Sequence, residues 1–286
     1  RSPASGMLQN PQMSNFDDLD YAGKAPNVVI RVGRGGGAPI LGGVSRDGAK
    51  TWKVFSSNPP EGKGSGTAAI SADGSVFVWA PAGAAAHWTQ DDGKTWSLCQ
   101  GLPQGVRIVS DKADPGRFLA YDRTSGTVYV SSDRAVSFNK SSDGMTSENG
   151  RPVFVFDRPG HVWLPTGSSL FRSSDGGVTW TRVQTISAEY LGFGKAAQTG
   201  GYPTIYVNGT LKGKPGLFRS TDEGKTWRQI NDADSGFGTM NVVTGDPRQF
   251  GRCYLGTNGR GVLIFDSKSL HGHQARQAVP SRSAVW

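Results

Sequence analysis

Ser173-Ser174-Asp175-Gly176-Gly177-Val178-Thr179-Trp180 is the stretch that decides the fold, because four further variants of this octapeptide occur along the chain. Their third position is always aspartate, and successive aspartates lie 44, 42, 42 and 47 residues apart. The five aspartates are Asp47, Asp91, Asp133, Asp175 and Asp222. This period is the length of one four-stranded blade, so the sequence predicts an all-β chain folded as a β-propeller.

The octapeptide has the consensus Ser-x-Asp-x-Gly-x-Thr-Trp, known as the Asp-box, and its residue types suit a hairpin turn. The carboxylate can accept hydrogen bonds from backbone N–H groups of its own turn, and glycine supplies a positive φ without steric cost. The tryptophan offers a large flat surface to bury between sheets. We therefore expect all five aspartates to be structural rather than acid–base groups. The third copy has Ala135 and Phe138 in place of glycine and tryptophan, which predicts a looser turn.

Short runs rich in β-branched and aromatic residues flank the octapeptides and divide the chain into units. Residues 12–266 are predicted to form six units of the propeller, and the sixth unit, residues 240–266, has no octapeptide. Residues 1–11 are expected to be an N-terminal remnant, and the polar residues 267–286 a disordered tail. Propellers close with four to eight blades, so about six blades of an expected seven are visible, the seventh lying before Arg1.

The composition fits many short strands and turns and argues against several other classes of protein. The chain contains 41 Gly, 16 Pro and 8 Trp among 286 residues, and no stretch has the roughly 18 apolar residues of a membrane-spanning helix. The formal charge is +8, but Lys and Arg are scattered singly, which indicates a solvated surface rather than a nucleic-acid site. No His/Cys spacing typical of a metal site occurs, so no metal or cofactor is predicted. Cys99 and Cys253 lie on separate repeats and are expected to be free thiols.

Several motifs outside the octapeptides carry a more specific signal. They are exemplified by Leu19-Asp20-Tyr21-Ala22-Gly23, Phe193-Gly194-Lys195-Ala196-Ala197 and Gly256-Thr257-Asn258-Gly259-Arg260-Gly261. Together and in this order, the motifs resemble the second half of glycoside hydrolase family 74, from about Met7 to Asp266. That family contains endo-xyloglucanases and reducing-end-specific xyloglucan hydrolases. The resemblance implies two seven-bladed propellers, with the substrate in the cleft between them.

The resemblance also implies inverting hydrolysis of a β-1,4-glucan backbone decorated with xylose, with one catalytic aspartate on each propeller. Inversion needs two carboxyl groups far enough apart to admit a water molecule. The family's acid lies in a Gly-Asp-x-Gly-Gly-Phe segment that this chain lacks, and the first propeller, which carries the base, is not part of the sequence. Both catalytic carboxylates are therefore expected outside this chain, which is predicted to be inactive alone.

An acidic cluster near the start of the chain is the only tempting substitute for the catalytic pair. It consists of Asp17, Asp18 and Asp20, but the sequence offers no positioned partner for any of them. Asp20 matches a family position in a blade strand, and Asp17 and Asp18 are expected to face solvent. No catalytic residue is therefore predicted in this chain.

Aromatic side chains outside the octapeptides are the candidates for contact with sugar, because glucan chains stack on exposed aromatic faces. Trp79 and Trp163 occupy equivalent places in two units, and each is followed two residues later by proline. This equivalence suggests that both lie at one common rim of the propeller. Trp88 and Tyr190 are also predicted to bind substrate, and Phe193 belongs to the same group. The alternative for each is packing between blades, since large aromatic residues are mostly buried.

Two functions remain open from the sequence. The first is part of a secreted glycoside hydrolase, with xyloglucan as substrate and the missing amino-terminal propeller as partner. The second is a non-catalytic glycan-binding or effector propeller, which the missing acid segment favours. Two sequons, Asn139-Lys140-Ser141 and Asn208-Gly209-Thr210, fit secretion. The choice between endo and exo action depends on loops in the cleft, and the sequence does not decide it.

Overall fold

The computed structural model describes residue 13 and residues 15–35, 37–147, 150–231, 240–258 and 261–267. The predicted N-terminal remnant, residues 1–11, and the predicted tail after Ser267 lie outside the described residues. Within the described ranges the chain forms strands and turns, without an α-helix. Accordingly, this part of the chain holds no helix long and apolar enough to cross a bilayer.

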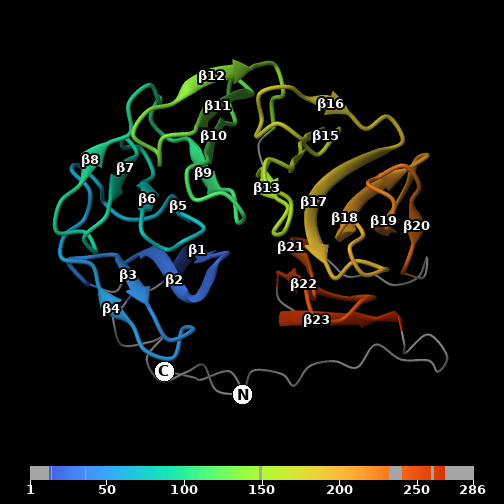
Figure 1. The fold of residues 1–286 in the computed structure, drawn as a ribbon, viewed down its shortest axis with the longest axis horizontal. Helices are drawn as coiled ribbons and strands as arrows, with labels where there is room; N and C mark the ends of the chain where they lie inside the picture. Colours follow the sequence, from blue (N-terminus) through green and yellow to red (C-terminus); the bar gives the residue numbers. More distant parts are fainter. Residues whose placement is uncertain are drawn as a thin grey trace. The chain divides into compact units, whose positions relative to one another are not determined.

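The strands of the described residues follow one another in six sheets, and each sheet keeps the strand order of the sequence (Figure 1). The first sheet contains β1 (Asn15–Ala22), β2 (Ala25–Arg34), β3 (Gly42–Ser45) and β4 (Lys53–Val54). The second contains β5 (Thr67–Ile70), β6 (Phe77–Ala80), β7 (His87–Thr89) and β8 (Ser97–Leu98). The third contains β9 (Arg107–Ser110), β10 (Phe118–Asp122), β11 (Thr127–Ser131) and β12 (Asn139–Ser142).

The remaining strands follow the same plan. The fourth sheet contains β13 (Val153–Phe154), β14 (Val162–Pro165), β15 (Leu170–Ser173) and β16 (Thr181–Arg182). The fifth contains β17 (Ile186–Gly194), β18 (Thr204–Leu211), β19 (Lys214–Ser220) and β20 (Arg228–Gln229). The sixth contains, in the described part of the chain, β21 (Met240–Gly245), β22 (Arg252–Thr257) and β23 (Gly261–Asp266).

Sequential four-stranded sheets of this kind are the blades of a β-propeller, so the predicted fold class is confirmed. The strands predicted before the third and fourth octapeptides, residues 127–130 and 169–172, correspond to β11 and β15. Five sheets have four strands, and the sixth has three among the described residues. The seventh blade stays a prediction.

The chain folds as two compact units. Unit one comprises the described residues within 13–147, 154–162 and 172–181, and unit two comprises those within 150–153, 163–171 and 182–267. Each unit is held by apolar clusters between consecutive sheets. In unit one, Ile30, Phe55 and Trp79 belong to the cluster between the first two sheets.

Two further apolar clusters lie between consecutive sheets in the same way. Val78 and Phe118 belong to the cluster between the second and third sheets of unit one. In unit two, Leu217 and Leu255 belong to the cluster between the fifth and sixth sheets. Because these sheets are covered on their faces, a strand such as β6 is buried at every position instead of alternating.

The two cysteines lie inside these apolar clusters. Cys99 and Cys253 are buried free thiols, as the sequence predicted. Burial raises the pKa of each thiol to about 12, so neither carries thiolate character at neutral pH.

Each octapeptide forms a turn fixed by its own carboxylate. In the second copy, Asp91 Oδ1 accepts the N–H of Thr95 at 2.9 Å and the hydroxyl of Thr89 at 2.8 Å, and Asp91 Oδ2 accepts the Thr95 hydroxyl at 2.7 Å. The other four copies have the same three contacts. The fourth and fifth positions have a positive φ in every copy, which is the region that favours glycine.

The third octapeptide keeps this geometry although its residues depart from the consensus. Ser137 replaces threonine and donates both its N–H and its hydroxyl to Asp133. Arg134 and Ala135 adopt φ values of 64° and 68°, where a side chain costs roughly 1 kcal/mol. The serines on both sides of Asp133 preserve three of the anchoring hydrogen bonds, and the expected looser turn stays a prediction.

In unit one, the octapeptides are also bonded to the sheet that precedes them. Ser57 Oγ, just after β4, donates to the carbonyl of Gly93 at 2.8 Å. The N–H of Gln100, just after β8, donates to the carbonyl of Val136 at 3.0 Å. Ser141 Oγ on β12 donates to the carbonyl of Gly177 at 2.7 Å. The second, third and fourth octapeptides are each fixed to the preceding sheet in this way.

The hydrogen bonds that the octapeptide carboxylates accept predict how the stability of the fold depends on pH. The Thr95 N–H and then the Thr95 hydroxyl lower the pKa of Asp91 to about 2, from an ordinary value of 3.8. Such a group stabilises the fold above its unfolded pKa, and this contribution is lost as the pH falls through the folded pKa. We expect Asp91→Asn to lower the melting temperature at neutral pH, with a deficit that shrinks between about pH 4 and about pH 2.

A calorimetric pH series on both chains checks this expectation. The control is Asp143→Asn, because Asp143 forms a solvent-exposed pair with Lys140 and such pairs contribute little. A deficit for Asp91→Asn that stays constant into the acid range would contradict the role of the ionised carboxylate.

Candidate functional site

Trp79 and Trp163, the leading candidates for sugar contact, lie in the core. Each is 1% exposed. Trp79 Nε1 donates to the carbonyl of Ser65 at 2.8 Å, and its ring packs 6.3 Å from the Trp96 ring, measured between centroids. Trp163 Nε1 donates to the hydroxyl of Tyr202 at 2.9 Å. Neither indole offers a face to a sugar, so their burial favours the alternative role, packing between sheets.

Trp88 and Tyr190 are half-buried, and their predicted contact with substrate stays a prediction. Trp88 lies on β7 and packs against the cluster between the second and third sheets. Tyr190 lies on β17 and packs against the cluster between the fifth and sixth sheets. They belong to different compact units. Phe193, the remaining candidate, is 5% exposed and is a core residue.

The acidic cluster on β1 bonds the first sheet to the second. Asp18 is 7% exposed, and its Oδ2 accepts the N–H of Ala68 on β5 at 3.0 Å. Asp17 is also largely covered, with 16% of its side chain exposed and Arg34 3.5 Å away. The expectation that Asp18 faces solvent is wrong, because β1 lies beside β5 and the Asp18 carboxylate meets that strand. The same expectation for Asp17 is wrong because most of its side chain is covered.

Asp20 extends the same connection to the third sheet. Its Oδ2 accepts the N–H of Ile70 on β5 at 2.9 Å, and Lys112 Nζ lies 2.6 Å from both carboxylate oxygens. Lys112 Nζ also donates to Ser110 Oγ at 2.8 Å and to the carbonyl of Tyr21 at 3.0 Å. Asp20 is therefore bonded on both oxygens, and sequence reasoning missed its lysine partner because 92 residues separate the two.

A second buried carboxylate, Asp111, connects the third and fourth sheets within unit one. It is fully buried, and its Oδ2 accepts the N–H of Gly160 at 2.7 Å and an Nη1–H of Arg117 at 3.1 Å. Its Oδ1 accepts the N–H of Ala113 at 2.8 Å. An aspartate after a strand is the only signal for this group in the sequence. Both of its oxygens already accept hydrogen bonds, which argues against a role in acid–base chemistry.

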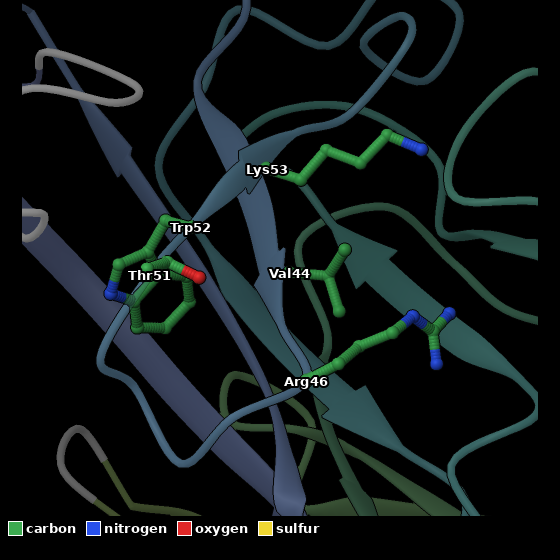
Figure 2. Close-up of a pocket in the computed structure, with 5 residues that line it drawn as sticks. All are labelled: Val44, Arg46, Thr51, Trp52 and Lys53. Carbon is green, nitrogen blue, oxygen red and sulfur yellow. The ribbon is translucent and has the colours of Figure 1, made fainter.

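A shallow pocket of about 200 Å³ lies beside the first octapeptide and is lined by Val44, Arg46, Thr51, Trp52 and Lys53. Figure 2 shows Thr51 and Trp52 on one side of the strand pair and Arg46 and Lys53 on the other. Arg46 Nη2 and Lys53 Nζ approach the carboxylate of Asp92 at 2.7 and 3.5 Å. The pocket is smaller than usual ligand sites of roughly 300–1,000 Å³, and its cations already share a counter-ion.

Eight of the described aspartates have a lowered pKa, because hydrogen bonds to the charged form outweigh desolvation: Asp47, Asp73, Asp91, Asp133, Asp143, Asp175, Asp222 and Asp246. The general acid of an inverting glycosidase needs a raised pKa, so these eight groups do not match that role. In the same part of the chain, no group of three His, Cys, Asp or Glu side chains is placed to hold a metal ion.

No protein-family model matches the chain, but curated relatives and solved structures do. A xyloglucanase of Paenibacillus sp is 32% identical over 277 residues, covering 92% of this chain and 27% of that protein. A xyloglucanase of Acetivibrio thermocellus is 34% identical, and the match covers 91% of this chain and 31% of that protein. An oligoxyloglucan-reducing end-specific xyloglucanase of Emericella nidulans is 32% identical, covering 92% and 37%. The chain therefore spans about a third of the length of these relatives.

Solved structures that resemble this chain include enzymes of the same kind as these relatives. The xyloglucanase of Xanthomonas campestris, a glycoside hydrolase family 74 enzyme, has a TM-score of 0.83 and 37% identity, covering 90% of this chain and 38% of that one. A family 74 enzyme of Niastella koreensis has a TM-score of 0.78 and 32% identity, and the match covers 91% of this chain and 38% of that one. YCF48 of Cyanidioschyzon merolae, with a TM-score of 0.60 and 18% identity, shares the fold alone.

The lysine network at Asp20 generates a prediction with a matched control. Lys112 and Asp20 form a pair at 2.6 Å with 11% and 14% of their side chains exposed. Removing one partner of a buried pair leaves an uncompensated charge, so Lys112→Met should lower the free energy of unfolding by about 3 kcal/mol. Lys140 and Asp143 form a pair at the same distance with 56% and 65% of their side chains exposed, so Lys140→Met should leave the free energy of unfolding nearly unchanged. Urea unfolding of the two variants measures the difference, and equal losses would refute the structural role of Lys112.

Proposed function

Because this chain belongs to glycoside hydrolase family 74 along the third of its relatives' length that it spans, we propose that it forms part of an enzyme that cleaves xyloglucan. The observation that carries the proposal is the relatedness to xyloglucanases, which extends over nine tenths of the chain at 32–37% identity in sequence and structure comparisons. Identity on this scale reaches well beyond the octapeptides, which occupy a small part of the sequence.

The proposed reaction is inverting hydrolysis of the β-1,4-glucan backbone. In that mechanism one carboxylic acid protonates the leaving oxygen, and a carboxylate on the opposite side activates a water molecule. We assign both groups to polypeptide outside this chain. The hydrogen bonds made by Asp18, Asp20 and Asp111 support that assignment, since each carboxylate is committed to holding sheets together.

The role that we assign to this chain is to supply part of the surface on which xyloglucan lies. Trp88 and Tyr190 are the sequence-predicted aromatics that keep an exposed portion, and an indole or phenol ring can stack on a glucose unit. The partner in this proposal is the missing amino-terminal propeller, which would complete the cleft. We further propose that the protein is secreted, because a cell-wall polymer reaches only an enzyme outside the cell.

The test measures hydrolysis and binding separately. We expect the purified 286-residue chain to release no reducing sugar from xyloglucan. The chain placed in the Xanthomonas campestris xyloglucanase, in exchange for its matching segment, should retain activity on xyloglucan. Turnover by the chain alone would refute the assignment of the carboxylates.

An inactive hybrid that is folded would instead favour the second function, a non-catalytic glycan-binding propeller. Affinity electrophoresis in a gel that contains xyloglucan, with hydroxyethyl cellulose as the control polymer, then shows whether the chain binds the glycan. Trp88→Ala should weaken any retardation of the chain in the xyloglucan gel, whereas the buried Trp79 is unsuitable for this comparison.

A further inference from the structure

The consensus of the octapeptide leaves its second, fourth and sixth positions free to vary. The second and sixth positions are exposed in all five copies. The fourth position is partly or fully covered in the second, third and fourth copies, where it holds Asp92, Arg134 and Gly176. In these three copies the residue contacts the preceding sheet, and we call its place the docking position.

The docking position of the second octapeptide carries a carboxylate and meets two cations of the first sheet. Asp92 Oδ1 accepts an Nη2–H of Arg46 at 2.7 Å, and Asp92 Oδ2 lies 3.5 Å from Lys53 Nζ. Arg46 and Lys53 lie on the same side of their strand pair (Figure 2). Only 17% of the Asp92 side chain is exposed, so a cation in its place would be held against two others.

The docking position of the third octapeptide has the opposite charge and meets an acid of the second sheet. Arg134 Nη1 donates to Asp73 Oδ2 at 3.0 Å and to Ser75 Oγ at 2.8 Å. Asp73 and Ser75 belong to the connection between β5 and β6. The hydroxyls of Ser71 and Ser75 donate to Asp73 Oδ1 at 2.6 and 2.8 Å. These bonds hold the other carboxylate oxygen towards Arg134.

The docking position of the fourth octapeptide has no side chain, because the third sheet fills the space. A Cβ on Gly176 would lie 2.7 Å from Nε and 2.8 Å from Cδ of Arg117. Arg117 belongs to the connection between β9 and β10, and ion pairs of 3.1 and 3.2 Å with Asp111 and Asp114 hold its guanidinium in place. The third sheet therefore leaves room for glycine at this position and excludes an aspartate or arginine side chain.

We propose that the docking position determines which sheet an octapeptide packs on. An acidic residue selects the first sheet, a basic residue selects the second, and glycine selects the third. The turns alone do not distinguish the sheets, because all five copies have the same carboxylate contacts.

The selection works through the cost of wrong pairs. On the first sheet, Arg134 would face the cations Arg46 and Lys53, and on the second sheet Asp92 would face the carboxylate of Asp73. Like charges brought together in this way suppress a wrong partner. Sheets of similar shape can exchange between chains or be skipped during folding, so a repeated fold needs such a signal. The inference goes beyond the proposed function, since it concerns the order of the sheets whatever the substrate.

The test exchanges the two docking charges within the 286-residue chain. Asp92→Arg together with Arg134→Asp keeps the composition and the net charge but sets each side chain against like charge. The melting temperature should fall by about 5 °C or more at low salt. Refolding from urea should give less monomer and more dimer or aggregate on size exclusion.

A neutral chain separates repulsion from the loss of two attractive pairs. Asp92→Asn together with Arg134→Asn removes both charges, and asparagine tolerates the φ values of 58° and 64° at these positions. Its melting temperature should fall by less than about 2 °C, because exposed ion pairs contribute little. In about 1 M NaCl the gap between the exchanged and neutral chains should shrink by more than about half, since salt screens the repulsion.

Two further variants keep the test decisive when the exchanged chain does not fold. Asp92→Arg alone should lower the melting temperature, and the addition of Arg46→Glu should recover about half of the loss or more. Asp143→Arg sets a like charge beside Lys140 within one sheet, where both side chains are exposed, and should cost less than about 2 °C.

Three results would overturn the proposal. The first is equal melting temperatures and monomer yields for the exchanged and neutral chains. The second is a gap between them that salt leaves unchanged. The third is a loss for Asp92→Arg that Arg46→Glu does not reduce. These readouts report folding, so they do not depend on xyloglucan hydrolysis.

Discussion

The hydrogen bonds between an octapeptide carboxylate and its own turn are the constraint on which the rest of the structure depends. They hold two consecutive residues at positive φ, even where those residues are Arg134 and Ala135. Because the turn is rigid, its carbonyls stay in place to accept bonds from the preceding sheet, and its aromatic residue enters the space between sheets. Local turn chemistry thus fixes the long-range stacking of sheets in unit one.

Carboxylates also form hydrogen bonds between the inner strands of neighbouring sheets. Asp18 and Asp20 bind backbone N–H groups of β5, and Lys112 connects Asp20 to the third sheet. Charges placed this way satisfy polar groups that would otherwise be buried without partners. These committed carboxylates are the basis for proposing that the catalytic carboxyl groups lie elsewhere and that the chain is one part of a larger catalytic unit.

The sequence predicted the fold well because the octapeptide is a local motif whose geometry depends on residues eight or fewer positions apart. It did not predict that Trp79 and Trp163 are buried, because their partners Ser65 and Tyr202 are not placed beside them by any local pattern. Gly192 on β17 is a similar case: glycine weakens a strand signal in the sequence, yet a Cβ there would lie 2.3 Å from the carbonyl oxygen of Val243. Close approach between two sheets requires that glycine, and only the structure shows it.

Hydrogen exchange at the octapeptides shows whether the carboxylates hold these turns. The N–H groups of five residues donate to carboxylate acceptors although the turns are at the surface: Thr51, Thr95, Ser137, Thr179 and Thr226. Measured by NMR or mass spectrometry at neutral pH, these five amides should exchange far more slowly than exposed loop amides such as those of Gly83 and Gly105. Exchange of all five at the rate of those loops would show that the carboxylates do not hold the turns, and the account of how the sheets are stacked would fail with them.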